Sequence, residues 1–299
     1  MRDYLLMGLM AVLWAGAFVS GKLSVAAIPP EIVAFLRFLV AGLTMLAIMG
    51  ALNWRELTFT RRDLGLILGL GATGIAGYNL LFFRGLHLAP ASDGAMIVPT
   101  LNPLITLFVA AILLGERLTA RKLTGASISL VGQVLIFWTL VQAAAADPTR
   151  LVGDLYYVGS AVCWSTYTIL GRIAAKRFTP MAATTVASVA GMLMLLPFAL
   201  WQYPGSSGYS LPFWGNILYL GWAATVAGFF LFNRGVTRLG ASRAAVFINL
   251  VPVFSVALAA LFLGERPTIL QVTGMLVVLS GVYLAGTATP QAPAPARAS

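Results

Sequence analysis

The 299-residue sequence is 60% hydrophobic and only 9% charged, and its formal net charge is +10. Ordinary soluble domains carry about 25% charged residues, so this composition excludes a soluble globule as well as a disordered or collagen-like chain. A single cysteine, Cys163, excludes an internal disulfide. The apolar surface must therefore face lipid. In such a chain the basic excess is typical of orientation in a bilayer, and we expect no nucleic-acid partner.

Ten stretches are long and apolar enough to be read as membrane helices, for which about 20 residues are needed. Turn residues such as Pro29-Pro30 and charged residues separate them. Ala15-Gly16-Ala17 has the form of a signal-peptide cleavage site, but the weakly basic start before it favours a first helix. The predicted helices are 4–26, 32–52, 64–83, 94–114, 123–142, 153–171, 180–201, 212–233, 243–263 and 269–287.

The basic residues are divided unequally between the two faces that these ten helices define. Fourteen fall on the face that carries both termini, four fall on the opposite face, and Arg37 remains inside a helix. Cytoplasmic loops of membrane proteins are enriched in Lys and Arg. The sequence therefore predicts a multi-pass protein with both termini in the cytoplasm.

In the first half, four predicted helices carry candidate binding residues. Trp14 lies near the middle of 4–26, where its N–H needs a partner. Arg37 lies about 8–9 Å inside 32–52 at 1.5 Å per residue. It either binds a substrate carboxylate or extends to the external boundary. Helix 64–83 adds Tyr78, Asn79 and Phe82, and helix 94–114 adds Pro99, Asn102 and Pro103. We place His87 in a loop, without a metal partner.

In the second half, Trp164 and Tyr167 lie near the middle of 153–171, and Asn249 and Pro252 interrupt 243–263. Proline removes a backbone donor and frees a carbonyl one turn earlier. Matched breaks in both halves of a chain point to a binding site at the middle of the membrane. The alternative is that the prolines form packed kinks and that the aromatic residues serve only packing.

The two halves also repeat each other in sequence. Leu114-Gly115-Glu116-Arg117 recurs as Leu263-Gly264-Glu265-Arg266, 149 residues later, and Trp14 matches Trp164 at 150. We predict one integrated membrane domain built from two five-helix repeats, 1–145 and 150–287, with a disordered tail at 288–299. Because five is odd, the second repeat enters the membrane from the other side, as in many secondary transporters.

These features resemble the drug/metabolite transporter superfamily and, within it, the EamA-type branch. The Leu-Gly-Glu-Arg sequence that closes the fourth helix of each unit, the Trp in each first helix and the Pro in each fourth helix carry the resemblance. The stretch from Tyr78 to Phe83 and Asn102-Pro103 further resemble the YddG-type exporters of aromatic and other neutral amino acids. The resemblance implies an all-α protein of ten transmembrane helices as two inverted repeats, in the bacterial inner membrane, and a monomer.

The function expected is export of a small molecule by alternating access, with aromatic or other neutral amino acids as cargo. Drug-like or nucleoside- and nucleotide-type cargo is the alternative, and a channel is a more remote one. All nine carboxylates are assigned to helix ends or loops, so we expect a facilitator or exchanger without proton coupling. No phosphate-binding loop or hydrolase motif occurs, and we expect no enzyme activity, cofactor or metal.

Overall fold

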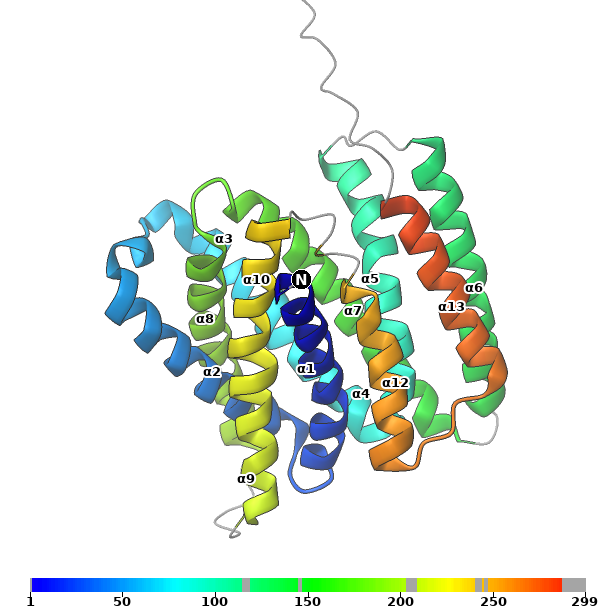
Figure 1. Ribbon diagram of the computed structural model, residues 1–299. Coiled ribbons are helices and arrows are strands. Elements are labelled where there is room, and N and C mark those ends of the chain that lie inside the picture. The colour runs from blue at the N-terminus through cyan, green and yellow to red at the C-terminus, as the bar shows by residue number, and fades with distance from the viewer. Residues whose placement is uncertain are drawn as a thin grey trace, which may run out of the picture.

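The computed structural model describes residues 2–114, 119–144, 147–202, 209–239, 244 and 247–286. These residues form α-helices joined by short 3-10 and π segments, and no strand occurs among them (Figure 1). The fold is therefore all-helical, as the sequence predicts. Two expectations concern residues outside this range: the disordered tail at 288–299 and the first Gly-Glu-Arg sequence at 115–117.

The first half begins with two helices separated by Pro29, and its third predicted helix is a continuous run of three segments from Leu64 to Leu88. The elements are α1 (Arg2–Val25), α2 (Pro30–Asn53), η1 (Trp54–Leu57), η2 (Arg61–Asp63), α3 (Leu64–Leu70), η3 (Gly71–Gly77), α4 (Tyr78–Leu88), α5 (Ala91–Leu114) and α6 (Ala120–Ala144).

The second half follows the same plan, and three of its helices begin at a side-chain cap followed by proline. Asp147, Thr179 and Ser210 accept from the first backbone N–H groups of α7, α8 and α9. The elements are α7 (Pro148–Ala174), α8 (Pro180–Trp201), α9 (Leu211–Leu218), η4 (Tyr219–Ala227), α10 (Gly228–Leu239), α12 (Leu250–Leu263) and α13 (Ile269–Gly286).

Six helical runs of the described residues are long and apolar enough to cross a membrane, and α12 and α13 are shorter apolar helices. The predicted helices 64–83 and 212–233 end too early, because the runs continue to Leu88 and Leu239. The basic residues near these predicted ends form ion pairs inside the longer runs: Arg84 pairs with Glu31 at 2.7 Å and Arg234 with Asp3 at 3.3 Å. His87 consequently lies within α4 and not in a loop.

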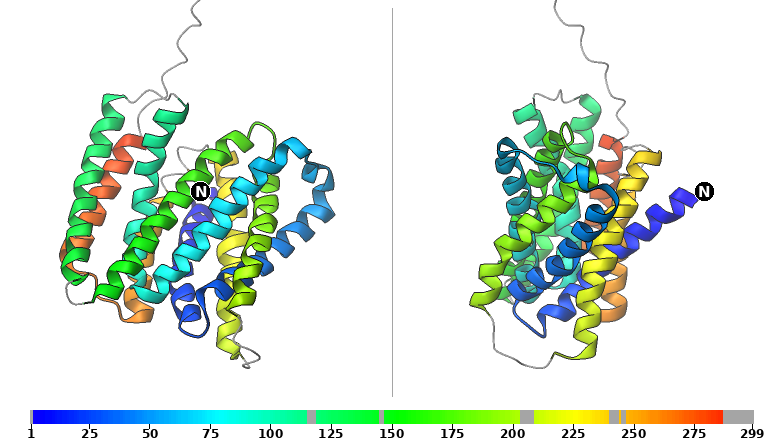
Figure 2. Two further views of the ribbon diagram at one scale, coloured as in Figure 1. Left: turned by 180° about the vertical axis from the view of Figure 1, so that it is seen from behind. Right: turned by 90° about the vertical axis from the view of Figure 1, so that its left-hand side faces the viewer.

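The arrangement places the two last helices of the halves, α6 and α13, side by side at one edge of the bundle (Figures 1 and 2). Glycines allow this close approach: a Cβ added at Gly132 would lie 2.6 Å from the Gly274 carbonyl oxygen. Helices α2 and α8 pack together at the opposite edge, and α1, α4, α5, α7 and α12 lie between the two pairs.

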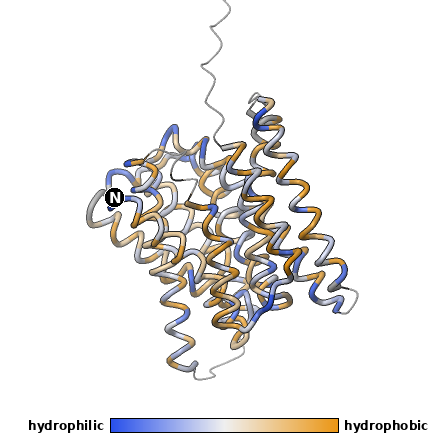
Figure 3. The backbone as a smooth tube through the Cα atoms, turned by 45° about the vertical axis from the view of Figure 1, so that its right-hand side comes forward, coloured by the Kyte–Doolittle hydropathy of each residue, from blue (hydrophilic) through white to orange (hydrophobic). Residues whose placement is uncertain are grey.

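The outer faces of the helices are apolar. Leu211, Ile112 and Leu261 are 84%, 79% and 74% exposed, and apolar segments run along the helices in Figure 3. A water-soluble protein rarely exposes such a continuous apolar surface. The described helices therefore form a multi-pass bundle that faces lipid.

One feature of the helices is not expected from the sequence. The π-helices η3 (Gly71–Gly77) and η4 (Tyr219–Ala227) occupy matching positions in the third helical run of each half. Such segments are rare and are frequently found at functional sites. Both adjoin the cavity described next.

Candidate functional site

A cavity of about 500 Å³ lies between the two halves of the chain. It is lined by residues of α1, α2, α4, α5, α6, α7, α10, α12 and α13 and of η3. Nine of the twelve residues predicted as a site line it together: Trp14, Arg37, Tyr78, Asn79, Phe82, Pro99, Asn102, Pro103 and Trp164. The structure thus brings these nine residues together in one cavity wall, and their role in binding stays a prediction.

The other three predicted residues lie near the cavity but do not line it. Tyr167 packs against Trp164, with ring centroids 5.2 Å apart. Asn249 is the residue before α12, and Pro252 is buried within that helix. In α5 the prolines lie inside a continuous helix, whereas in the second half the helix α12 begins after Asn249. The residues of this region that face the cavity are Ile248 and Val251.

Aromatic rings form much of the cavity wall. Tyr78 and Phe82 stack with centroids 5.5 Å apart and an interplanar angle of 13°, and Tyr78 contacts Trp164 at 5.0 Å. Phe229 joins the two tryptophans, with its ring 5.7 Å from Trp14 and 6.3 Å from Trp164. Such rings offer large apolar faces of defined geometry to a small molecule.

Arg37 is the charged residue deepest in this wall. It is 9% exposed, and its guanidinium is held inside the bundle by two side chains. Its Nε donates to Thr225 Oγ1 at 3.0 Å and its Nη1 donates to Asn79 Oδ1 at 3.2 Å. These partners are neutral, and no ion pair of Arg37 is found among the described residues. A buried cation without a carboxylate partner favours binding of an anionic group.

The partners of Arg37 lie in one π-helix and directly after the other. Thr225 lies in η4 and donates its hydroxyl to the carbonyl of Leu220, five residues earlier, at 2.8 Å. Asn79 follows η3, and its Nδ2 donates to the Ile75 carbonyl at 2.8 Å. Both acceptor oxygens are thereby fixed, so the direction of the Arg37 guanidinium is set by backbone carbonyls of both halves.

The cavity has internal pseudo-symmetry that the repeat explains. Residues 150 apart line it as pairs, namely Trp14 with Trp164, Phe18 with Thr168, Asn79 with Phe229, and Val98 with Ile248. Phe18 and Phe229 were missed in the sequence-based set. The repeat offset from Asn79 would have found Phe229, whereas Phe18 corresponds to Thr168, which was not predicted either. At the same offset Arg37 corresponds to Ala187, so this cation belongs to one half alone.

The cavity extends to one end of the bundle. Lys122 in the first turn of α6, Arg172 in the last turn of α7 and Ala285 near the end of α13 line it there. The sequence places both basic residues on the cytoplasmic face without a role in the site. Their reach into the cavity depends on side-chain direction, which the spacing of charges does not reveal.

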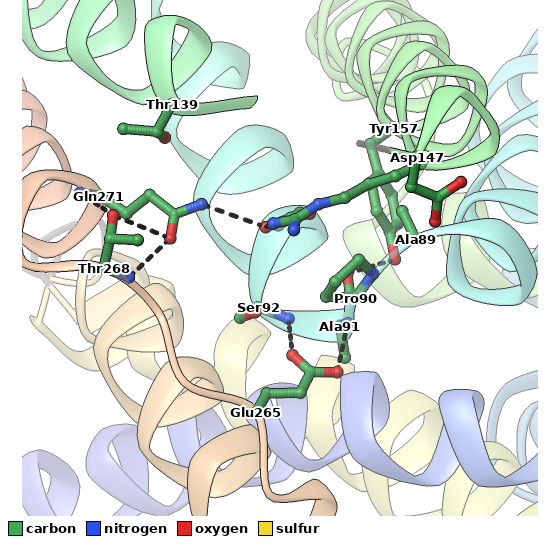
Figure 4. A network of polar contacts seen from close by, with 12 residues as sticks. Ala89, Pro90, Ala91, Ser92, Thr139, Asp147, Tyr157, Glu265, Thr268 and Gln271 are labelled. Atoms are coloured by element: carbon green, nitrogen blue, oxygen red, sulfur yellow. Dashed lines mark hydrogen bonds and ion pairs between the residues drawn. The ribbon is translucent and has the colours of Figure 1, made fainter. Parts of the chain in front are cut away.

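At the opposite end of the bundle lies a network that we call the polar seal, formed by Lys22, Asp93, Arg150, Asp154, Glu265 and Gln271. The carboxylate of Glu265, from the segment between α12 and α13, accepts from the N–H groups of Ala91 at 2.8 Å and Ser92 at 2.7 Å (Figure 4). Glu265 thereby caps the start of α5. The second Gly-Glu-Arg sequence thus ties one half of the chain to the other.

The remaining members of the seal surround Asp93, which is 1% exposed. Arg150 donates to both of its oxygens, at 2.7 and 2.9 Å, and Gln271 Nε2 donates to Oδ1 at 3.4 Å. Lys22 Nζ donates to the carbonyls of Leu86 at 2.6 Å and Ala89 at 2.8 Å. The seal therefore joins α1, α4, α5, α7 and α13.

Asp154 corrects one expectation from the sequence. It is the seventh residue of α7 and is 2% exposed, so the assignment of every carboxylate to a helix end or a loop is wrong here. The helix begins earlier than predicted, at Pro148, which places Asp154 almost two turns inside it.

Comparison with known proteins identifies the scaffold. The sequence profile of the EamA-like transporter family matches residues 1–138 and again residues 151–287. The chain belongs to this family. The double match also supports the internal repeat, and membership makes the protein a multi-pass membrane transporter with a small-molecule substrate.

Individual relatives cover nearly the whole chain. The "Uncharacterized transporter YyaM" of Bacillus subtilis is 30% identical and covers 92% of this chain and 90% of its own. Some relatives are named for amino acids. A "Probable terminal-alkyne amino-acid exporter" of Streptantibioticus cattleyicolor is 26% identical, over 92% of this chain and 90% of its own. A "Probable amino-acid metabolite efflux pump" of Escherichia coli is 24% identical, over 95% of this chain and 94% of its own. A crystal structure of a protein with 24% identity matches the fold with a TM-score of 0.67, over 95% of this chain and 96% of that chain.

Proposed function

We propose that this transporter exports neutral amino acids, with aromatic or other apolar side chains, and that Arg37 binds their carboxylate. The observation that carries the proposal is a buried guanidinium that has neutral partners and faces an aromatic cavity. The names of two relatives, an amino-acid exporter and an amino-acid metabolite efflux pump, support the same cargo.

The cavity suits each part of such a molecule. Its volume of about 500 Å³ falls in the range of small-ligand sites, about 300–1,000 Å³. Arg37 pairs with the carboxylate, while the stacked Tyr78 and Phe82 rings contact the side chain. The ammonium group is placed toward Trp164 by cation–π attraction and toward Asn102, whose amide oxygen accepts hydrogen bonds.

Transport proceeds by alternating access in a single chain of ten membrane helices, arranged as two inverted repeats in the bacterial inner membrane. Four ion pairs support this topology, because each joins residues assigned to one face. Arg84 pairs with Glu31 and Arg150 with Asp93 outside, and Arg177 pairs with Asp63 and Arg234 with Asp3 inside. The cavity then faces the cytoplasm, and the polar seal closes its external side. We propose a monomer with both termini in the cytoplasm.

The carrier acts as a facilitator or exchanger that moves cargo down its own gradient. The described lining of the cavity contains no carboxylate that would exchange a proton for the cargo. Uptake into proteoliposomes with an imposed pH gradient tests this mechanism. Accumulation that strictly requires the pH gradient would contradict it.

The substrate assignment is tested by counterflow in proteoliposomes, using phenylalanine and phenethylamine, which lacks the carboxylate. The unchanged protein should exchange phenylalanine and discriminate against the amine. Arg37→Gln should lower phenylalanine exchange about tenfold or more, since a hydrogen bond to a charged group contributes roughly 1.5–3 kcal/mol. The variant should also reduce the preference for phenylalanine over phenethylamine. Arg37→Lys keeps the charge and should retain part of the flux. Equal phenylalanine exchange by the unchanged protein and Arg37→Gln contradicts the assignment.

A second cargo is favoured by one observation, the presence of Lys122 and Arg172 in the cavity lining together with Arg37. Three basic residues suit a phosphate-bearing cargo such as a nucleotide. Counterflow with a nucleoside monophosphate separates the two cargoes. Saturable exchange of the nucleotide without exchange of amino acids would replace the first assignment, and ohmic current without saturable exchange would indicate a channel.

A further inference from the structure

The strongest feature outside the cavity is the contact between two acidic side chains in the polar seal. The carboxyl groups of Asp93 and Asp154 lie within hydrogen-bonding reach of each other, and the two residues are only 1% and 2% exposed. Both oxygens of Asp154 are buried without a hydrogen-bond donor among the described residues. As an ionised group, Asp154 would therefore be a buried and unsatisfied charge.

Protonation of one of the two carboxyl groups would remove this buried charge. Two carboxylates in contact cannot both be ionised at low cost, because their charges repel each other in a site that excludes water. When one of the two groups is protonated, its O–H donates to the other and the repulsion between the two charges is removed. Asp93 already accepts from Arg150 and Gln271, so the proton is best placed on Asp154.

The charges around the pair lead to the same result. Arg150 of α7 and Lys22 of α1 are the cations of the polar seal, and Glu265 adds a third acid to Asp93 and Asp154. Two cations balance two acids, and one proton on the third acid makes the seal neutral. The other elements in contact add neutral groups: Gln271 from α13 and the Tyr157 hydroxyl, which donates to the Pro90 carbonyl at 3.1 Å.

We propose that Asp93 and Asp154 form a proton-binding site in the polar seal, occupied when the seal is closed and emptied when it opens. Opening admits water, which solvates both carboxylates and removes the need for the shared proton. The closed seal therefore binds one more proton than the open seal. By linkage, low pH stabilises the closed state and rising pH favours opening. This proton-binding site goes beyond the proposed transport function, because it controls when the external side opens and not which molecule is carried.

Thiol labelling of the seal tests the site without any cargo. In a Cys163→Ser background, Ser92→Cys places a nearly isosteric thiol on a residue that is 4% exposed and lies within the closed seal. Gln202→Cys provides an exposed reference thiol. The labelling rates with a maleimide are measured on purified protein from pH 6 to 8.5, and the ratio of the two rates removes the titration of the thiols themselves.

The ratio should rise with pH in the parent, by at most tenfold per pH unit for a single linked proton. Asp154→Asn mimics the protonated acid, and its amide still donates to Asp93, so its ratio should stay low and change less than twofold over the range. Asp147→Asn is the matched control at the start of the same helix. The hydrogen bond from Thr149 lowers the pKa of Asp147, which therefore stays ionised over this range, and the control should keep the slope of the parent.

Two results would overturn the proposal: a ratio that does not vary with pH in the parent, or the same slope in Asp154→Asn as in the parent. The first needs no variant of the acid pair, so the proposal remains testable even if Asp154→Asn does not fold. Neither result bears on the cargo, which is tested separately through Arg37.

Discussion

At the scale of single residues, Trp164 contacts aromatic rings from both halves of the chain in the cavity wall. Its ring lies 5.0 Å from Tyr78, 5.2 Å from Tyr167 and 6.3 Å from Phe229. Trp164→Ala removes a stacking surface, and aromatic pairs contribute roughly 0.5–1.5 kcal/mol beyond the area they bury. We expect phenylalanine counterflow to fall about tenfold at normal protein levels.

The control for this prediction is Trp201→Ala, since Trp201 ends α8 and is 88% exposed. An interfacial tryptophan contributes to membrane anchoring and not to the cavity, so its removal should change counterflow less than twofold. Equal losses in the two variants would show that Trp164 serves general packing.

The limits of the sequence are also visible at this scale. The repeat brings Trp14 and Trp164 into one cavity because both residues occupy the same place in their units. Asn249 and Pro252 were also predicted from the repeat, but they do not line the cavity. A helix break indicates where the backbone changes direction, and it does not indicate which of the nearby side chains face the cavity. Asp154 was misplaced because α7 begins at Pro148, before the apolar stretch from which the helix was predicted.

At the scale of helices, the contact between α6 and α13 depends on glycine. A Cβ at Gly132 would lie 2.6 Å from the Gly274 carbonyl oxygen and 2.7 Å from Val278 Cγ2. Gly132→Ala should therefore force the helices apart at a cost of about 1–3 kcal/mol, which lowers the melting temperature of the purified protein by several degrees. Gly215→Ala in α9 meets no atom within 4 Å and should leave the melting temperature unchanged or raise it. Equal effects of the two substitutions would contradict the close packing.

The helices themselves were largely predictable, because long apolar stretches bounded by proline and charge leave few alternatives. The π-helices η3 and η4 were not. A π segment differs from an α-helix by one residue in each hydrogen-bonded turn, and hydropathy does not register this change. Yet these segments fix Thr225 and Asn79 against Arg37, so the least predictable part of the backbone orients the residue on which the proposed function rests.

At the scale of the whole molecule, the two halves share a scaffold but differ in their charged residues. The repeat supplies matched walls for the cavity, whereas the single Arg37 and the Asp93–Asp154 pair have no equal in the other half: the residues 150 positions from Arg37 and Asp93 are Ala187 and Arg243. A symmetric scaffold explains how two states of similar packing arise. The asymmetric charges then give one state a different affinity for cargo and for protons.

The orientation of the whole bundle can be tested with two exposed positions. Thr58 lies between η1 and η2, on the face where fourteen of the basic residues fall, and Gln202 follows α8 on the face with four. In a Cys163→Ser background, a membrane-impermeant maleimide added to intact cells should label Gln202→Cys, because the basic face stays in the cytoplasm. Thr58→Cys should be labelled only after the membrane is permeabilised. The reverse pattern would place the cavity mouth outside and the polar seal inside, and external pH would then no longer control the seal.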